Sequence, residues 1–158
     1  MADYCGVDRI DRRILQELQS DGRLSNTELA DRVGLTPSPC LRRVRHLEET
    51  GVIRGYRALL DGGAVGSGFQ AFVTVVMRYE DQETVAEFER QVAGMPEVVE
   101  AHRLFGDPDF LLRVSVADLA AYESFYTERL SGLPGVAQVT SHVAMKTVKP
   151  DAGLSVTG

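Results

Sequence analysis

The sequence predicts an α+β protein in which an N-terminal helix-turn-helix domain is joined to a C-terminal ferredoxin-like βαββαβ domain. Two observations lead to this prediction. Two short helix signatures flank a three-residue turn within residues 24–51, which is the spacing of a helix-turn-helix motif. Farther along, VAGMPEV at 92–98 recurs as LSGLPGV at 130–136, each copy between a helical pattern and a β-prone run.

A first helix is expected from Asp8 to about Gln19, where apolar residues recur at helical spacing. These residues are Ile10, Ile14, Leu15 and Leu18. Their face can close a three-helix unit over apolar residues of the next two helices. Those residues are Leu29, Val33, Val44 and Leu47.

The second helix begins with a capping box, in which Ser25 caps the first turn and Glu28 reaches back to Ser25. Leu24 and Leu29 have the spacing of a hydrophobic staple. Gly34 supplies the left-handed residue that ends the helix.

The third helix is predicted to start at Pro37 with Thr36 as its cap, and Gly51 ends it. One face carries Cys40, Leu41, Val44 and Leu47. The other carries Ser38, Arg42, Arg45 and Glu49, with Arg43 and His46 at its flanks. This pattern fits a solvated surface helix of an ordinary bundle. It also fits a helix that places cations and short polar side chains in a DNA groove, and the tight motif spacing favours DNA.

The remaining elements follow in order. Residues 52–60 are β-prone and are predicted as a wing or connecting strand, followed by the Gly-rich linker DGGAVGSG at 61–68. Strands are then expected at 69–79, 98–105, 110–116 and 136–148, and helices at 84–92 and 119–130. The predicted divisions are 1–56 for the helix-turn-helix domain, 57–68 for the connection, 69–149 for the βαββαβ domain and 150–158 for a flexible tail. A βαββαβ sheet leaves one face open, often for a second subunit.

The 158-residue chain has a net charge of −6, which is unevenly divided. Residues 1–57 hold 10 Arg against 9 Asp and Glu, whereas residues 58–158 hold 7 Lys and Arg against 14 Asp and Glu. The first part is therefore nearly neutral, so one copy would make few phosphate contacts and oligomers are expected. No apolar run is long enough to span a membrane, and the N-terminus lacks a signal core, so the cytoplasm is expected.

Residues 104–110, LFGDPDF, form a tight connection between two predicted strands. It fits a plain hairpin with solvated aspartates. It also fits a loop whose backbone N–H groups and Asp107 or Asp109 bind a zwitterion. Catalysis finds little support, because His46, His102 and His142 fall in three different elements. Tyr79, Tyr122 and Tyr126 are expected in the core or an interface, and Cys5 and Cys40 as buried or free thiols. Neither a metal nor a cofactor is expected.

The chain resembles the leucine-responsive regulatory protein/AsnC (Lrp/AsnC) family of transcription regulators over about residues 7–149. The resemblance rests on VDRIDRRIL (7–15), DGRLSNTELADRVGLTPSPCLRRVRHLEETGVIRGY (21–56), GDPDFLLRV (106–114), LPGV (133–136) and VAMKTVK (143–149). It implies a DNA-binding helix-turn-helix domain and an amino-acid-sensing domain. It also implies dimers that pair through their sheets and assemble into tetramers or octamers on double-stranded DNA.

The resemblance further implies which residues bind. The positions expected at DNA are Thr36, Ser38, Pro39, Arg42, Arg43 and Arg45. Thr36 and Ser38 would meet phosphate, and Arg42 and Arg45 would meet base edges. The effector pocket, between dimers, would use Leu104, Gly106, Asp107, Pro108, Asp109, Ser141, His142 and Val143.

The expected function is a sequence-specific DNA-binding regulator, not an enzyme, whose assembly or DNA affinity responds to an amino-acid-type effector. Two alternatives remain from the sequence. One is a ligand-insensitive protein that compacts DNA. The other is an amino-acid-sensing module that regulates an enzyme and uses its helices only for docking.

Overall fold

The computed structural model describes residues 6–78, 81–151 and 153–156. The chain divides into two compact units: Met1–Ala58 together with Val148–Gly158, and Leu59–Thr147. Among the described residues, every helix is too short or too polar to cross a membrane. Cys5 and Tyr79, which the sequence singles out, lie outside the described residues.

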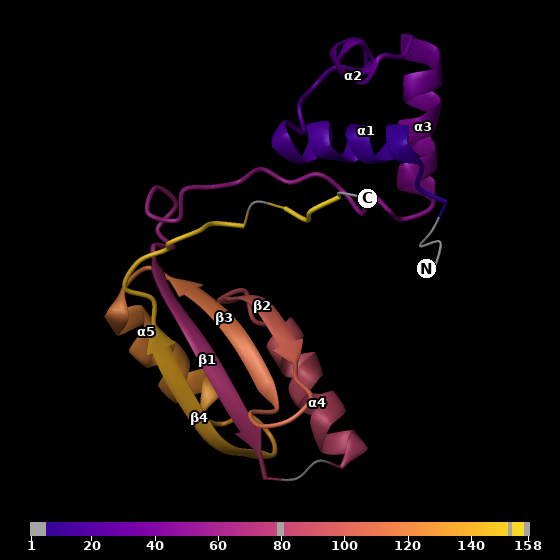
Figure 1. Ribbon diagram of the computed structural model, residues 1–158. Helices are drawn as coiled ribbons and strands as arrows, with labels where there is room; N and C mark the ends of the chain where they lie inside the picture. Colours follow the sequence, from indigo (N-terminus) through magenta and orange to yellow (C-terminus); the bar gives the residue numbers. More distant parts are fainter. Residues whose placement is uncertain (1–5, 79–80, 152, 157–158) are drawn as a thin grey trace. The chain divides into compact units, whose positions relative to one another are not determined.

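The first unit contains α1 (Arg9–Ser20), α2 (Asn26–Val33) and α3 (Pro37–Glu49), drawn in indigo and purple in Figure 1. Local side-chain chemistry sets the helix starts. Asp8 caps α1 in a capping box with Asp11, and Ser25 and Glu28 form the predicted box at α2. The predicted left-handed Gly34 follows α2 with a φ of 76°.

The core of this unit is the predicted one, with a single exception. The buried members are Ile14, Leu29, Ala30, Val33, Cys40 and Leu47, and Ile10, Leu15, Leu18 and Val44 pack against them. The exception is Leu41, predicted on the apolar face but 38% exposed. It follows Cys40 by one helical step of about 100°, which turns it away from the core that Cys40 enters.

The prediction of a strand at residues 52–60 is wrong for this structure, which shows none there. A strand requires a hydrogen-bonded neighbour, and the described part of the first unit offers no second strand. The Ile53 N–H instead donates to the Leu47 carbonyl at 2.9 Å. Gly51 and Gly55, with φ of 74° and 150°, interrupt the extended backbone.

The second unit contains the predicted split βαβ fold (Figure 1). Its elements are β1 (Phe69–Met77), α4 (Gln82–Ala93), β2 (Val98–Arg103), β3 (Phe110–Val116), α5 (Leu119–Phe125), a π-helical turn η1 (Tyr126–Leu130) and β4 (Val136–Val143). The strands pair antiparallel in the order β2-β3-β1-β4. Both copies of the sequence repeat connect a helical segment to an edge strand, and Met95 and Leu133 within them are buried.

The two faces of this sheet differ in burial. Alternate residues of β1 and β3, such as Val73 and Leu112, are fully buried in the same core as Phe88 of α4 and Phe125 of α5. The opposite face of β1 carries Gln70, Phe72, Thr74 and Val76. Phe72 on that face is 40% exposed, so the helices cover only one side of the sheet.

Two connecting segments are more ordered than their composition suggests. In the Gly-rich segment, the Ser67 N–H donates to the Gly62 carbonyl at 2.6 Å, and the Asp61 carboxylate accepts the Ala64 N–H. The segment from Val148 groups with the first unit. There, the Gln19 carboxamide bonds both the N–H and the carbonyl of Leu154, at 2.6 and 2.9 Å.

Candidate nucleic-acid interface and ligand loop

The outer face of α3 presents a stripe of side chains at helical spacing, and this stripe lines an open hollow of about 680 Å³. The residues of the α3 stripe are Ser38, Leu41, Arg42, Arg45, His46 and Glu49. The hollow also reaches Gly6, Asp8, Asp11 and Arg43 at the start of α1. A convex helix with an unpaired polar stripe has the shape and chemistry to enter a major groove.

The three predicted arginines of α3 differ in what they contact. Among the described residues, neither Arg42 nor Arg45 has an acidic partner within ion-pair distance, and both are exposed. The Nη1 of Arg43 lies 2.7 Å from Asp8 Oδ2 and 2.8 Å from Asp11 Oδ1. Arg43 is thus bound within the protein, whereas Arg42 and Arg45 are free to bind an external anion.

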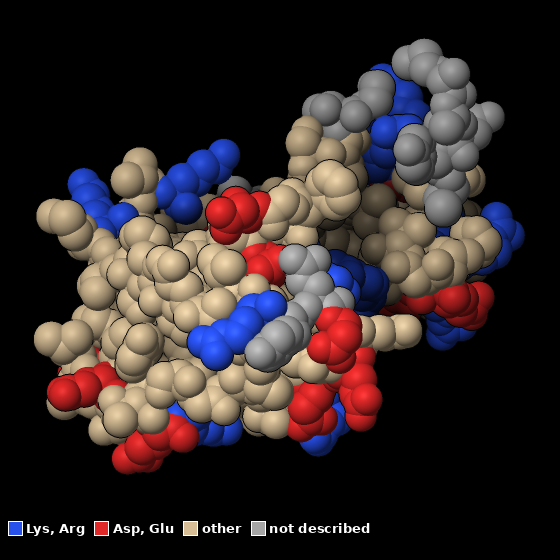
Figure 2. Space-filling model, turned by 90° about the horizontal axis from the view of Figure 1, so that it is seen from below, with Lys and Arg blue, Asp and Glu red and all other residues tan. Residues whose placement is uncertain are grey.

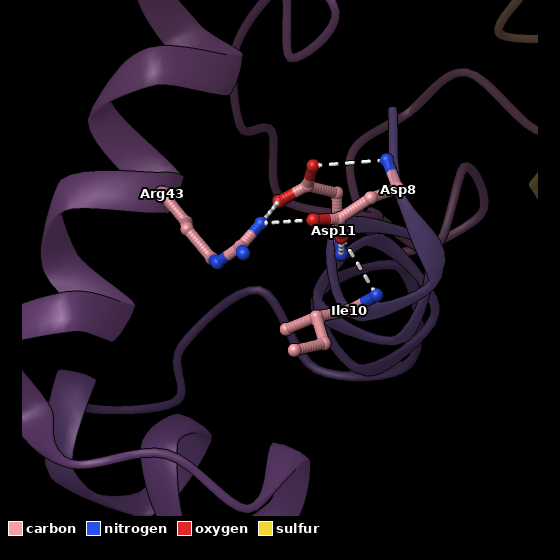
Figure 3. Close-up of polar contacts among 4 residues, drawn as sticks. All are labelled: Asp8, Ile10, Asp11 and Arg43. Carbon is pink, nitrogen blue, oxygen red and sulfur yellow. Dashed lines mark hydrogen bonds and ion pairs between the residues drawn. The ribbon is translucent and has the colours of Figure 1, made fainter. Parts of the chain in front are cut away.

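Electrostatics at the start of α1 agree with this division (Figure 3). The carboxylates of Asp11 and Asp8 raise the pKa of Arg43 above its ordinary value. The Asp11 backbone N–H and then Arg43 lower the pKa of Asp8. In Figure 3 the carboxylates of Asp8 and Asp11 converge on one guanidinium nitrogen of Arg43. These shifts favour the charged forms of Arg43 and Asp8.

The N-terminus of α3 offers fewer donors than a typical helix start. Thr36 is the N-cap residue, as predicted, but its side chain makes no capping hydrogen bond. Pro37 and half-buried Pro39 have no N–H, so among residues 37–39 only Ser38 has a backbone N–H. Any phosphate contact at this end would thus depend on Ser38 and on the hydroxyl of Thr36.

Two contributions were not foreseen from the sequence. Asn26, the first residue of α2, donates from Nδ2 to the Pro37 carbonyl at 2.8 Å, which ties the two helices of the motif together. Leu41 adds an exposed apolar side chain to the α3 stripe, suited to the methyl group of thymine. Helical spacing alone places Leu41 with the core residues. Its exposure depends on how α3 is rotated about its own axis, which the spacing does not show.

The second candidate site is the loop between β2 and β3, where the structure distinguishes the two aspartates. Asp109 Oδ2 accepts the Met77 N–H at 2.6 Å, and the Asp109 N–H donates to the Val75 carbonyl. Asp107 is exposed, and its peptide bond to Pro108 is cis. Asp109 therefore fastens the loop to β1, and Asp107 is the carboxylate available to a ligand. Leu104 is 38% exposed, and Gly106 adopts a φ of 116°.

The predicted last-strand residues lie elsewhere on the sheet. Ser141 accepts the Tyr122 hydroxyl at 2.6 Å on the helix-covered side, while His142 pairs with Phe72 on the open side. Val143 pairs with Ala71, at the end of β1 opposite Val75, to which the loop is bonded. Within one chain, the Gly106–Asp109 loop and residues 141–143 are therefore not brought together.

The histidines do not form a catalytic group. His46 lies on α3, His102 on β2 and His142 on β4. His102 Nε2 is 3.3 Å from Glu100, which also accepts Arg113 at 2.8 Å. Tyr122 is buried and Tyr126 partly buried in the core of the second unit, as predicted. Cys40 is buried, and its burial raises the pKa of the thiol.

Charge is distributed in small groups over the surface. Figure 2 shows one face of the molecule, on which basic side chains stand in separate clusters among acidic ones. Over residues 1–57 the 10 Arg nearly balance the 9 Asp and Glu. One copy of α3 thus contributes a local cationic contact rather than a strongly basic domain, and its affinity for a polyanion is correspondingly limited.

Comparison with known proteins identifies a family for each of the two domains. Residues 7–54 match the family model for a winged helix-turn-helix DNA-binding domain. Residues 70–154 match the model for the Lrp/AsnC ligand binding domain. The chain is also 44% identical over 143 residues to the leucine-responsive regulatory protein of Escherichia coli K12, covering 90% of this chain and 87% of that protein.

Solved structures show the same arrangement of elements. An AsnC family transcriptional regulator from Agrobacterium tumefaciens is 41% identical, with a TM-score of 0.89 over 94% of this chain and 97% of its own. A transcriptional regulator from Neisseria meningitidis, solved as a complex with L-methionine, is 39% identical, with a TM-score of 0.86 over 90% and 92% of the two chains. The helix-turn-helix unit, the βαββαβ unit and these matches together show that the chain belongs to the Lrp/AsnC family of transcriptional regulators.

Proposed function

We propose that this regulator recognises specific DNA sequences through the α3 stripe, with Arg42 and Arg45 at base edges and Ser38 and Thr36 at the backbone. The observation that carries this proposal is the pairing pattern of the three arginines. Arg43 is bound to Asp8 and Asp11, whereas Arg42 and Arg45 project from the same exposed face with no acidic partner among the described residues. An arginine fork matches the two acceptors of guanine in the major groove, and exposed Leu41 on the same stripe suits thymine.

The test is DNA affinity across a range of salt concentrations for R42A, R45A and the double variant. Removing these side chains should weaken binding to a cognate duplex by about 1–3 kcal/mol each and relax the sequence preference. The salt slope reports phosphate contacts and should change little. R90A is the matched control, because Arg90 pairs with exposed Glu87 in the second unit. Unchanged affinity in the double variant would remove the assignment of α3 as the recognition helix.

We further propose that an amino acid is the effector and that the β2–β3 loop binds it. The family match to a ligand-binding domain supports this, as does the L-methionine bound by the Neisseria relative. Asp107 is the exposed carboxylate of the loop, placed to pair with an ammonium group, and backbone N–H groups near Gly106 can receive a carboxylate. Because residues 141–143 lie elsewhere on the sheet, a complete site would combine loops of neighbouring chains.

A panel of amino acids in a thermal-shift assay tests the effector proposal. One or more should raise the melting temperature of the wild type, and D107N should lose that shift while E123Q, a change at an exposed carboxylate of α5, should keep it. If no amino acid raises the melting temperature of the wild type, the result favours the alternative of a ligand-insensitive protein that compacts DNA. If D107N responds like the wild type, Asp107 is not the ammonium partner.

Assembly links the two sites in this proposal. The open sheet face around Phe72 is suited to a second copy, and a dimer would present two α3 stripes to successive turns of DNA. An effector that binds between dimers shifts the assembly only by its difference in affinity for the two states, about 1–3 kcal/mol in typical cases. We propose that the protein acts in the cytoplasm, as a regulator rather than an enzyme.

A further inference from the structure

The start of α1 and the middle of α3 share one ion-pair network, shown in Figure 3. A single nitrogen, Nη1 of Arg43, donates to Asp8 Oδ2 at 2.7 Å and to Asp11 Oδ1 at 2.8 Å. These two contacts join residues that are 35 and 32 positions apart in the chain. They connect the first helix of the unit directly to the helix that carries Arg42 and Arg45.

Every carboxylate oxygen of Asp8 and Asp11 accepts at least one hydrogen bond. Asp8 Oδ1 caps α1 by accepting the N–H groups of Ile10 and Asp11, at 2.8 and 2.9 Å. Asp11 Oδ2 accepts the Asp8 N–H at 3.1 Å. The remaining oxygen of each aspartate faces Arg43. The capping box and the contact with α3 are therefore separable, because they use different oxygens of the same side chains.

Because Asp11 is buried, its contact with Arg43 constrains the position of α3. Asp11 is the one buried charged residue in the described part of the chain, with 6% exposure. A buried carboxylate requires a donor, and removing that donor costs more than the net gain of forming the pair. Arg43 supplies the donor with its side chain 31% exposed, so α3 is held in the rotation that brings Arg43 to Asp11.

The rotation of α3 decides where its other arginines point. Arg42 precedes Arg43 by one helical step of about 100°, and Arg45 follows it by two. With Arg43 fixed on α1, Arg42 and Arg45 fall on the exposed stripe that lines the hollow. We infer that Arg43 is a positioning residue, an internal clamp with Asp8 and Asp11 that orients α3 for DNA and does not itself bind DNA.

This inference rests on the proposed DNA contact of α3. It predicts that neutralising Asp8 or Asp11 changes DNA affinity in the direction opposite to that expected from charge alone. Asp8 and Asp11 lie next to the candidate interface, so neutralising either one should strengthen the attraction to phosphate if charge alone mattered. If the aspartates instead orient α3 through Arg43, neutralising them should weaken DNA binding.

D8N and D11N test this in the full-length protein. Asparagine keeps the oxygen needed for the cap and is itself a good N-cap residue, but it places an NH₂ group opposite Arg43. We expect each variant to bind cognate DNA about tenfold more weakly, the equivalent of one charge-assisted hydrogen bond, with the salt dependence unchanged. Stronger binding by D8N and D11N would overturn the clamp.

Arg43 variants supply the second arm. R43M should weaken binding with the wild-type salt slope, because Arg43 neutralises no phosphate if it acts only within the protein. R43K should recover part of the affinity, because an ammonium can donate to both carboxylates as the single Nη1 does, but it ends one bond nearer to the backbone. The double variant R43M/D8N should bind no more weakly than R43M, because R43M already removes the Arg43–Asp8 contact that D8N would break. A flattened slope in R43M, or additive effects on affinity, would show that Arg43 acts at DNA independently of Asp8.

Thermal unfolding of the DNA-free protein separates failure of the clamp from failure of the proposed function. Unfolding is followed by far-UV circular dichroism. The clamp predicts that R43M lowers the melting temperature and that the effects of R43M and D8N on stability are not additive. It also predicts a wild-type melting temperature for R42A/R45A. If R42A/R45A leaves DNA binding intact, α3 is not the recognition helix, and the inference that Arg43 orients it for DNA falls with that result. If instead R43M and D8N are additive in stability, the clamp alone is overturned.

Discussion

At the scale of single residues, side chains and glycines next to the helix ends set where the helices of the first unit begin and stop. The Ser25–Glu28 capping box and the left-handed Gly34 follow from patterns within four residues of chain, and the structure confirms both. The partners of Arg43 were not predictable in the same way, because Asp8 and Asp11 are more than 30 residues distant. The sequence grouped Arg43 with Arg42 and Arg45, and only tertiary contacts separate them.

A titration of Tyr56 tests the electrostatics of the first unit. Burial, and then its 3.0 Å hydrogen bond to Glu48, raise the pKa of Tyr56 to about 12. The neutral phenol is thus favoured in the folded state, so its stabilising contribution is present below pH 10 and is lost as pH rises toward 12. The ultraviolet difference titration of wild type against Y56F should show one phenol ionising near pH 12. A midpoint near 10 would contradict the Tyr56–Glu48 contact.

At the scale of elements, helices and strands with clear periodicity were predicted closely. Errors arose where a strand needs a neighbouring strand, or where the rotation of a helix determines which side chains are buried. β3 matches its predicted range of 110–116, because its alternation is regular. Residues 52–60 have β-prone composition but lack a neighbouring strand, so no strand forms. Leu41 fits the apolar stripe by spacing, yet the rotation of α3 against α1 and α2 leaves it exposed. Partner and rotation are tertiary properties that a local pattern does not contain.

The Gly-rich turn provides a test at this scale. A Cβ on Gly62 would lie 2.7 Å from the Ser67 carbonyl oxygen, and that contact is with backbone, which cannot move without breaking the turn. G62A should therefore disrupt the Gly62–Ser67 hydrogen bond and speed proteolytic cleavage within 61–68. G132A is the control, because a Cβ at Gly132 meets nothing within 4 Å. Equal cleavage rates in G62A and wild type would show that the turn is not ordered as described.

At the scale of the whole molecule, the division into two units and the uneven charge were readable from the sequence, whereas the composition of the candidate ligand site was not. The predicted loop is bonded to Val75 of β1, whereas residues 141–143 pair with residues 71–73, nearer the start of that strand. They can join only across chains, which a single sequence does not display. The near-neutral first unit and the open sheet face both favour an assembly in which several weak DNA contacts act together.

Solution mass tests the role of the open sheet face. F72E places a carboxylate on that face, where Phe72 is 40% exposed, and should lower the mass measured by light scattering by preventing pairing of sheets. L119E is the matched control, since Leu119 is 63% exposed on α5 and lies outside the proposed interface. A wild-type mass for F72E, or a monomeric wild type, would exclude pairing through this face.

If α3 reads DNA sequence through Arg42 and Arg45, the sequence preference of the protein depends on those two side chains. The most direct measurement is selection of bound duplexes from a random-sequence pool, followed by sequencing, for the wild type and for R42A/R45A. We predict that the wild type enriches a shared sequence and that the double variant loses this enrichment while retaining weak binding. Enrichment of the same sequence by the double variant, or of none by the wild type, would contradict the claim.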